Sequence, residues 1–227
     1  MPALALIKKM ENKKKFQNQS DDEILQASDS RPSVQVSKWF SRGYLPHYHA
    51  PGKIQHVVIC LVDAIPVKVI HRFHGFSNPQ PHGLQKKPSI RAILDLGRGA
   101  CLLKNRLAAG FVRDSILYGH PERYELHAWV VMPNHVHVLL KQNAEWSLGK
   151  VVSGWKRHTT KLMKVLPEAA CYRKFDGSFQ IWKPDYWDRY VRNSVEFEKL
   201  KRYIEANPVK AGLVQDPKLW PWSSATF

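Results

Sequence analysis

The sequence predicts an α+β domain in which helices pack on one side of an antiparallel sheet. Two observations lead to this fold class. The predicted elements follow the order strand, helix, strand, strand, helix and a further helix. The two adjacent strands are separated by only a short turn, which predicts an antiparallel hairpin. A ferredoxin-like, split βαβ arrangement satisfies this order of elements.

The strands are predicted from runs of β-branched and apolar residues. The first run covers residues 54–62 (IQHVVICLV), the second 124–132 (YELHAWVVM) and the third 136–141 (VHVLLK). Pro133 and Asn134 are a turn dipeptide between the second and third strands, so these two strands form the predicted hairpin. Residues 186–192 are expected to be extended or irregular.

The helices are predicted from apolar spacing and from capping residues. Leucines and other apolar residues at helical spacing predict a helix over 104–118 that stops at Gly119. A basic helix is expected over 147–165, with Ser147 as its N-cap. A third helix is expected over 194–206, with Ser194 as N-cap and Pro208 ending it. A short helix is also expected over 66–73.

The chain is expected to divide into a disordered tail, residues 1–40, and one domain, residues 41–227. The tail contains charge runs such as Lys13–Lys15 within a polar stretch. Within the domain, Pro and Gly predict loops over 41–52 and over 75–88. The final segment, 217–227 (PKLWPWSSATF), is aromatic and interrupted by proline, and we expect it to pack on the domain.

Composition excludes several classes of protein. The chain has 227 residues, 44% of them hydrophobic, yet contains no run of 18 apolar residues that could span a membrane. Its first residues have the wrong order and length for a secretory signal. The three cysteines form no CxxC pair, which argues against a disulfide framework or zinc ribbon. A cytoplasmic, nucleoid-associated protein is the expectation.

The charge balance indicates a polyanionic partner. Lys and Arg number 35 against 19 Asp and Glu, which gives a formal net charge of +16. A surplus of this size favours nucleic acid, although a basic protein without such a partner is the alternative. The eight Trp, eight Tyr and nine Phe suit base stacking, but most aromatic residues fill cores.

Two histidines at i and i+2, His135 and His137, are the first candidate site residues. Side chains two apart on a strand point to the same face, so two imidazoles there can share one metal ion. The residues between and after them are apolar, which predicts a buried, central strand. The alternative is one hydrogen-bonded core histidine and one surface histidine.

The second candidate pair is Tyr203 and Asn207, which are four apart and therefore on one face of the predicted helix. The Asn207 oxygen is a suitable third ligand for a hard cation in the last helical turn, and Tyr203 would present a phenol to whatever the metal binds. The alternative is a core tyrosine and a C-capping asparagine. Together with the histidines and the basic surface, the pair indicates a metal-assisted phosphodiester site with Tyr203 as nucleophile and Mn²⁺ or Mg²⁺ as cofactor.

Candidate DNA-binding residues cluster on the basic helix and after it. Phosphate contacts are expected from basic residues of the helix and of the segment that follows, and base stacking from one tryptophan. These candidates are Lys150, Lys156, Arg157, Lys161, Lys183, Arg189, Arg192 and Trp155. For the helix, a merely solvated basic face is an equally good interpretation.

The sequence resembles the REP-associated tyrosine transposases, single-tyrosine members of the HUH endonuclease superfamily, over roughly residues 41–225. The resemblance rests on YLPHYHAPG, LDLGRGACLL, RYELHAWVVMPNHVHVLL, SGWKRHTTK, YWDRYVRNSVEFEKLKRYIEANPVKAGLV and WPWSSA. It implies a ferredoxin-like sheet with His135 and His137 as the metal pair on a central strand, Tyr203 as nucleophile and Asn207 as the polar ligand. It also implies cleavage and rejoining of single-stranded DNA with REP-like palindromic hairpins, through a 5′-phosphotyrosine.

Three other interpretations stay open. The protein could be a DNA-binding regulator without catalysis, or a metal-dependent phosphoester hydrolase in which Tyr203 is structural. A replication initiator or relaxase would use the same chemistry, but such proteins often have more histidines or paired tyrosines. Tyr186 and Tyr190 are rival nucleophiles, although neither has a polar partner four residues later. A monomer and a homodimer are both compatible with the sequence.

Overall fold

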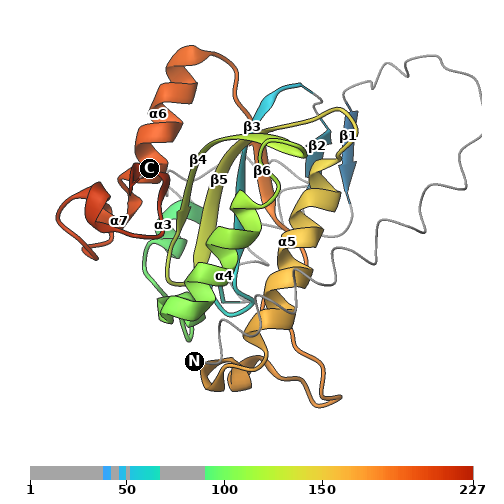
Figure 1. Cartoon of the computed structure of the whole chain (residues 1–227), viewed down its shortest axis with the longest axis vertical. Coiled ribbons are helices and arrows are strands. Elements are labelled where there is room, and N and C mark those ends of the chain that lie inside the picture. The colour runs from blue at the N-terminus through green and yellow to red at the C-terminus, as the bar shows by residue number, and fades with distance from the viewer. Residues whose placement is uncertain (1–37, 42–45, 50–51, 67–89, 227) are drawn as a thin grey trace, which may run out of the picture. The chain divides into compact units, whose positions relative to one another are not determined.

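A four-stranded antiparallel sheet organises the part of the chain that the computed structural model describes, which is residues 38–41, 46–49, 52–66 and 90–226. The strands are β3 (Ile54–Cys60), β4 (Tyr124–Val131), β5 (His135–Gln142) and β6 (Trp187–Tyr190). They lie in the order β4-β5-β3-β6, and every neighbouring pair is antiparallel (Figure 1). β5 is therefore a central strand, as predicted. The segment expected to be extended or irregular contributes the edge strand β6.

The connections between the strands give the ferredoxin-like arrangement. Helices α3 (Ile90–Leu94) and α4 (Arg106–Leu117) lie between β3 and β4 in the chain, and α5 (Leu148–Met163) lies between β5 and β6. A β-α-β-β-α-β chain with this strand order is the split βαβ fold, so the predicted fold class is confirmed. Helices α6 (Ser194–Glu205) and α7 (Asn207–Lys210) follow the last strand, and short 3₁₀ segments complete the chain.

Helices cover both faces of the sheet, which corrects the expectation of helices on one side. Val136, Val138 and Leu140 of β5 belong to the main core, together with residues of α4 and α5. Leu139, which points to the opposite face, packs in a second core with residues of α6, including Leu200. In Figure 1, α4 and α5 lie on one side of the sheet, and α6 lies apart from them beside β4. The second face is the one that matters for the site.

The helices begin at capping residues that the sequence only partly predicts. Ser147 caps α5 as expected, since its side chain accepts a hydrogen bond from the Lys150 N–H. Asn193, not Ser194, caps α6 by accepting from the Glu196 N–H. Asn105 caps α4, so this helix starts two residues later than predicted. Asn is as good an N-cap as Ser, so composition alone does not separate adjacent candidates.

A second, two-stranded sheet lies within the segment predicted as a loop. β1 (Lys38–Ser41) pairs antiparallel with β2 (Pro46–His49), so the loop prediction is wrong for 46–49. Proline is tolerated as the first residue of a strand, which is where Pro46 stands. β1 runs across the predicted boundary at residue 40, and the division into tail and domain stays a prediction. The predictions for 1–37 and 75–88, and all but the first residue of 66–73, lie outside the described residues.

The described part of the C-terminal segment, residues 217–226, packs along the outer edge of β4, and the sequence predicts that this segment packs on the domain. Ser223 forms an isolated antiparallel bridge with Val130. The Val131 N–H donates to the Trp222 carbonyl at 2.8 Å, and the Trp220 indole donates to the Val131 carbonyl at 2.9 Å. The segment thus adds hydrogen bonds to the outer side of this edge strand. Among the described residues, no helix has the length and apolar character needed to cross a membrane.

Candidate active site on the central strand

His135 and His137 lie side by side on β5, on the sheet face that α6 covers. Both residues are buried, and their Nε2 atoms are 3.1 Å apart. Burial lowers the pKa of His135 to about 3, so its imidazole is neutral at physiological pH. The neutral ring is the form that binds metal ions. The predicted pair therefore exists in a geometry in which two ring nitrogens face one point.

Asn134, in the turn before β5, fixes the orientation of His135. Its Nδ2 donates to the carbonyl of Arg98 at 3.0 Å and lies 3.4 Å from that of Leu94, so its Oδ1 is the atom that faces the ring. That oxygen lies 2.6 Å from His135 Nδ1. Because an amide oxygen only accepts, Nδ1 carries the proton and Nε2 keeps its lone pair for a ligand.

His56 of β3 orients the second histidine and is not among the site residues predicted from the sequence. Its Nε2 lies 3.1 Å from His137 Nδ1, and the two rings stack with centroids 5.2 Å apart. The contact leaves Nε2 of His137 directed toward His135. No local sequence pattern identifies His56 as part of the site, because it is 81 positions away from His137 in the chain. Only the register, which pairs His56 with Leu139, brings it beside His137.

Tyr203 reaches the histidines from α6. Its ring meets the ring of His137 edge to face, with centroids 5.6 Å apart, and its hydroxyl is buried. Lys210 of α7 places its Nζ 4.6 Å from the centroid of the same ring. The structure thus brings the predicted tyrosine to the predicted histidine pair and adds a positive charge beside it.

Asn207 is placed differently from the expectation. It does not end the helix of Tyr203 but begins α7, because Ala206 separates the two helices. Its Nδ2 still reaches back to the Tyr203 carbonyl at 3.2 Å. Its Oδ1 is buried and has no hydrogen-bond partner among the described residues. A buried acceptor without a partner costs free energy, so a cation or a water there would be favourable.

The three candidate ligand atoms fit a divalent ion that accepts both nitrogen and oxygen ligands. Two neutral imidazole nitrogens and one amide oxygen suit Mn²⁺ better than Mg²⁺, which prefers oxygen ligands. Across the described ranges, no group of three or more His, Cys, Asp or Glu side chains is placed to hold a metal ion. A site here would therefore depend on His135, His137 and the amide of Asn207.

The rival tyrosines lie away from the histidines. Tyr190 is paired with Gln55, one residue before His56, so it points to the sheet face opposite His56 and His137. Tyr186 is buried, and its ring centroid lies 4.3 Å from the ring centroid of His47, which is hydrogen bonded to Asp188 of β6. The geometry places Tyr203, and neither rival, beside the histidine pair.

Three predicted DNA contacts are engaged inside the protein. Trp155 is buried, and its indole donates to the Tyr124 hydroxyl at 3.0 Å, so its ring does not face solvent for base stacking. The Lys156 ammonium donates to three backbone carbonyls, those of residues 183–185. Lys183 is buried and donates to the carbonyls of Val62 and Ile65. These long amphipathic side chains pack their stems inward, which a helical wheel does not reveal.

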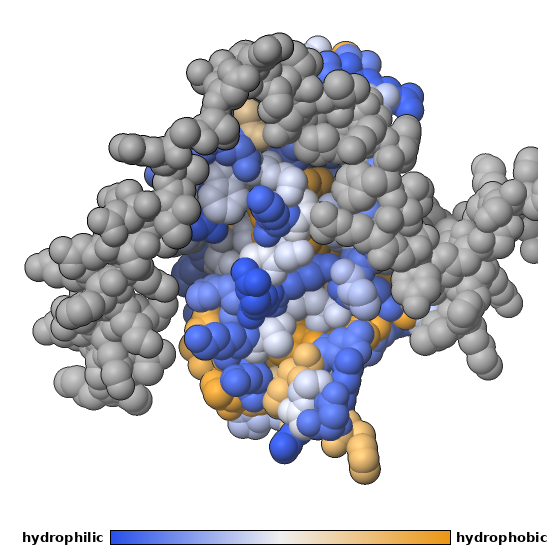
Figure 2. All heavy atoms as spheres, turned by 90° about the vertical axis from the view of Figure 1, so that its right-hand side faces the viewer, coloured by the Kyte–Doolittle hydropathy of each residue, from blue (hydrophilic) through white to orange (hydrophobic). Residues whose placement is uncertain are grey.

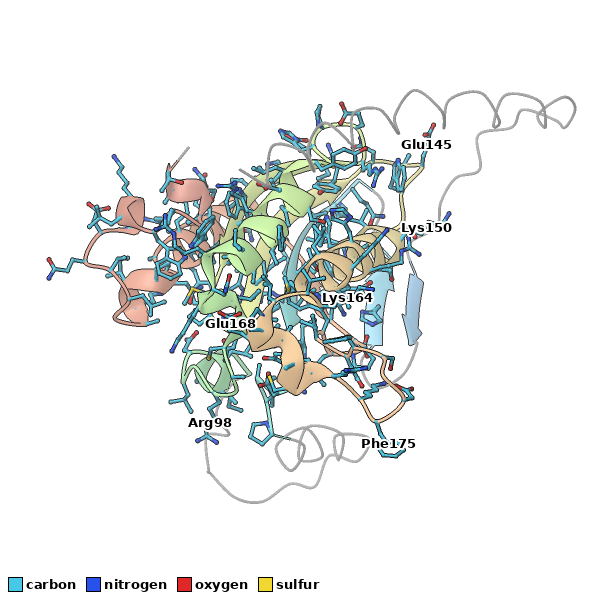
Figure 3. The ribbon with its side chains drawn as sticks, turned by 60° about the horizontal axis from the view of Figure 1, so that its bottom comes forward. Arg98, Glu145, Lys150, Lys164, Glu168 and Phe175 are labelled. Atoms are coloured by element: carbon cyan, nitrogen blue, oxygen red, sulfur yellow. The ribbon has the colours of Figure 1, made fainter. Side chains whose placement is uncertain are left out.

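The other predicted basic residues are exposed. Lys150, Arg157 and Lys161 lie on the outer side of α5, and Arg192 is exposed beyond β6. Arg189 is exposed too, but it forms an ion pair with Glu196 at 2.8 Å. Figure 2 looks onto the side that carries α5, where hydrophilic side chains gather, and Figure 3 shows Lys150 projecting outward. These residues form the basic face of α5 and its surroundings.

One exposed aromatic residue was missed. Phe175 is fully exposed at the tip of a turn between Arg173 and Phe179, and it projects away from the body in Figure 3. Asp176 stabilises this turn by accepting from the Ser178 N–H and hydroxyl. The turn signal Asp-Gly was visible in the sequence, but exposure of the ring was not.

The segment that carries the histidine pair and Tyr203 also matches a known protein family. Residues 118–207 match the family model described as "Transposase IS200 like". This range contains both histidines, Tyr203 and Asn207. The chain is therefore similar to the IS200-like transposases in the segment that carries the candidate site.

The particular relatives are REP-associated tyrosine transposases, which confirms the resemblance found in the sequence. The chain is 30% identical over 101 residues to the REP-associated tyrosine transposase of Escherichia coli, covering 44% of this chain and 54% of that one. It is 27% identical over 103 residues to a putative REP-associated tyrosine transposase of Haemophilus influenzae, covering 44% and 58% of the two chains. The matched region thus spans little more than half the length of these curated relatives.

A solved structure shares the fold. The structure of a REP-associated tyrosine transposase bound to a REP hairpin superposes with a TM-score of 0.50 and 20% identity, covering 78% of this chain and 79% of that one. At this identity the similarity establishes the fold alone. It agrees with the four-stranded antiparallel sheet and its helices described above.

Proposed function

We propose that this protein is a metal-dependent transposase that cleaves and rejoins single-stranded DNA carrying REP-like hairpins, through a 5′-phosphotyrosine on Tyr203. The observation that carries the proposal is the contact between the Tyr203 ring and His137, within a site of two facing imidazole nitrogens. The similarity to REP-associated tyrosine transposases supports the choice of DNA as substrate.

The chemistry assigned to Tyr203 is nucleophilic substitution at phosphorus. Its phenol oxygen forms a bond to the scissile phosphorus, and the bond between phosphorus and the 3′-oxygen breaks. The phenol proton is lost to solvent, and the released 3′-oxygen takes up a proton. The DNA 5′-phosphate stays attached to Tyr203 until a 3′-hydroxyl attacks it and restores the phosphodiester. The ammonium of Lys210 lies where it would favour negative charge at the tyrosine.

His135, His137 and Asn207 would hold the divalent ion. When bound, the ion would supply Lewis-acid polarisation of the scissile phosphate. Asn134 and His56 keep both histidine Nε2 atoms directed to one point. The buried Asn207 Oδ1 adds the oxygen donor. In this way the chain itself would orient the three ligand atoms for the metal ion.

The exposed basic residues are proposed to hold the DNA backbone. Lys150, Arg157 and Lys161 on α5 and Arg192 after β6 would contact phosphates, which makes binding strongly dependent on salt. Arg189 would contribute only if DNA competes with Glu196 for its guanidinium. Trp155, Lys156 and Lys183 have no place in this proposal, because their polar groups are used within the fold.

The test is formation of a covalent adduct. Purified protein is incubated with Mn²⁺ and single-stranded hairpin DNA labelled at its 3′ end, because that end stays with the 5′-phosphotyrosine. A denaturing gel should show label at the mass of the protein. Tyr203→Phe and addition of a chelator should each abolish the band, whereas Tyr190→Phe, a tyrosine on the other sheet face, should retain it.

Other outcomes identify other functions. An adduct that persists in Tyr203→Phe would move the nucleophile to another tyrosine. Cleavage without an adduct would indicate a hydrolase in which Tyr203 is structural. Salt-sensitive binding to the hairpin without any cleavage would indicate a DNA-binding regulator.

A further inference from the structure

A cleft lies beside α6, between the end of α4, the start of β4 and the C-terminal segment. Its volume is about 910 Å³, within the roughly 300–1,000 Å³ typical of ligand sites. Apolar side chains line it together with three basic and two acidic side chains. The apolar lining residues are Leu117, Leu126, Trp129, Ala206, Pro217 and Ala225, and the polar lining residues are His120, His127, Lys201, Arg202, Glu205, Asp216, Lys218 and Ser224.

A β-bulge aims His127 at this cleft. The register of β4 against β5 shifts between Leu126 and Ala128, so His127 is the extra residue that has no partner position on β5. Its ring is held edge to face against Phe197 of α6, with centroids 5.3 Å apart. Bulges commonly redirect a side chain next to a functional site, and this one brings an imidazole to the cleft wall.

The Nε2 atom of His127 is buried and makes no hydrogen bond with any described residue. The other ring nitrogen, Nδ1, lies 3.8 Å from a carboxylate oxygen of Glu125, on the far side of the ring. Burial lowers the pKa of His127, which favours the neutral ring. A proton on Nδ1, toward Glu125, leaves Nε2 as an acceptor. A buried acceptor of this kind is costly unless a bound group supplies a donor.

The charges of the cleft favour an anionic ligand. The carboxylate of Glu205 is engaged by the Ser224 hydroxyl at 3.3 Å and by the Lys201 ammonium at 3.9 Å. The other carboxylate of the lining, that of Asp216, accepts a hydrogen bond from the Lys218 backbone N–H at 2.8 Å. The charged groups of Arg202 and Lys218 make no ion pair within the described part of the chain. An apolar lining, a buried acceptor and two cations without an ion pair together suit a nucleotide, which offers a flat base, N–H donors and a phosphate.

We propose that this cleft binds a segment of single-stranded DNA, with a base against the apolar lining residues donating to His127 Nε2 and phosphates near Arg202 and Lys218. The inference rests on the proposed function, because it takes DNA as the substrate. Arg202 is next to Tyr203 in α6 but lines the cleft, whereas Tyr203 contacts His137. A strand held in the cleft is therefore anchored to the helix that carries the nucleophile.

The experiment measures binding of two fluorescent DNA probes by anisotropy, a dT12 single strand and a blunt-ended hairpin without single-stranded flanks. His127→Phe keeps the ring against Phe197 but removes the acceptor, so it should weaken binding of dT12 about fivefold, the effect of one hydrogen bond. Binding of the blunt hairpin should not change. His127→Gln, which restores a polar side chain, should recover part of the affinity for dT12.

The salt dependence provides an independent readout. Lys218→Gln should reduce the slope of log K against log salt for dT12 by about 0.7, the value for one lost contact to single-stranded nucleic acid. Lys199→Gln makes the same charge change at an exposed position of α6 that does not line the cleft, and it should leave the slope at its original value. Thermal denaturation of each variant verifies that it is folded.

The result that overturns the inference is unchanged affinity for dT12 in folded His127→Phe, or equal effects of the Lys218 and Lys199 substitutions on the salt slope. The adduct assay on Tyr203 separates this failure from failure of the proposed function. Wild-type protein that forms the adduct while its His127 variant binds dT12 normally would refute only the cleft. Loss of dT12 binding in the variant, without an adduct in the wild type, would support the cleft and refute the transposase.

Discussion

Replacing Asn134 with alanine should weaken the metal site more than it disturbs the fold. Asn134 connects His135 to the loop at Arg98 through one good hydrogen bond on each side, 2.6 Å to the ring and 3.0 Å to the carbonyl. At about 1 kcal/mol for each bond, plus a partly unsatisfied Nδ1, the loss of unfolding free energy is about 3 kcal/mol. Most domains tolerate a loss of this size, since their stability is about 5–15 kcal/mol.

The effect on the metal is expected to be larger in relative terms. Without Asn134, the ring of His135 is free to rotate or to change tautomer, and groups that orient metal ligands typically contribute about 10- to 100-fold in affinity. Binding of Mn²⁺ to the protein without DNA, followed by calorimetry, should therefore weaken by at least about tenfold. Unfolding in guanidinium chloride, followed by tryptophan fluorescence, measures the stability separately.

A matched control is Asn143→Ala. Asn143 also ties a loop through its Nδ2, which donates to the carbonyls of Pro121 and Glu122, but it makes no hydrogen bond to a histidine of the described segments. Its substitution should lower stability by about 1–2 kcal/mol and leave Mn²⁺ binding unchanged. If Asn134→Ala binds Mn²⁺ within twofold of the wild type, the reasoning about ring orientation is wrong and Asn134 serves only the fold.

Three further substitutions test the packing. Burial lowers the pKa of Lys156 from 10.5 to about 8. Between these pH values the unfolded chain binds more protons than the folded chain, so the unfolding free energy rises with pH, by up to about 3 kcal/mol. The unfolding free energies of wild type and Lys156→Met, measured in urea from pH 7 to 10.5, should therefore diverge, and parallel curves would contradict this. Gly119→Ala would place a Cβ 2.5 Å from the Tyr124 ring, and thermal melting should show a loss of about 1–3 kcal/mol or more. Gly154→Ala, on α5 in open space, should gain about 0.5–1 kcal/mol in the same assay, and a loss would reveal an unexpected contact.

The elements of the sheet were predictable because their signals are local. The β-branched runs and the Pro133–Asn134 turn identify β3, β4 and β5 to within two residues. β2 was not predictable in the same way, because Pro46 and nearby glycines outweigh its strand signal, and tertiary contacts of His47 with Asp185 and Asp188 compensate. Long-range pairing decides such short strands.

The candidate site was predictable in its reactive residues but not in their support. The pattern His-x-His places two rings on one face by strand geometry alone, and the family resemblance points to Tyr203. The roles of His56 and Asn134 depend on register and on a turn that folds back, which leave no periodic signal. Lys156 and Lys183 were wrongly predicted to contact DNA. The sequence shows their positive charge but not that backbone carbonyls of the fold accept their hydrogen bonds.

The C-terminal segment has a consequence for solubility. Strand β4 is at the edge of the sheet, and an uncovered edge is a template on which other chains can add strands. Here the bridge between Ser223 and Val130, with the bonds from Trp220 and Trp222 to Val131, occupies the C-terminal end of that edge. Residues 220–226 therefore occupy backbone groups of β4 to which another chain could otherwise pair. A chain shortened before Trp220 would keep its histidines and Tyr203, yet present a bare strand to its neighbours.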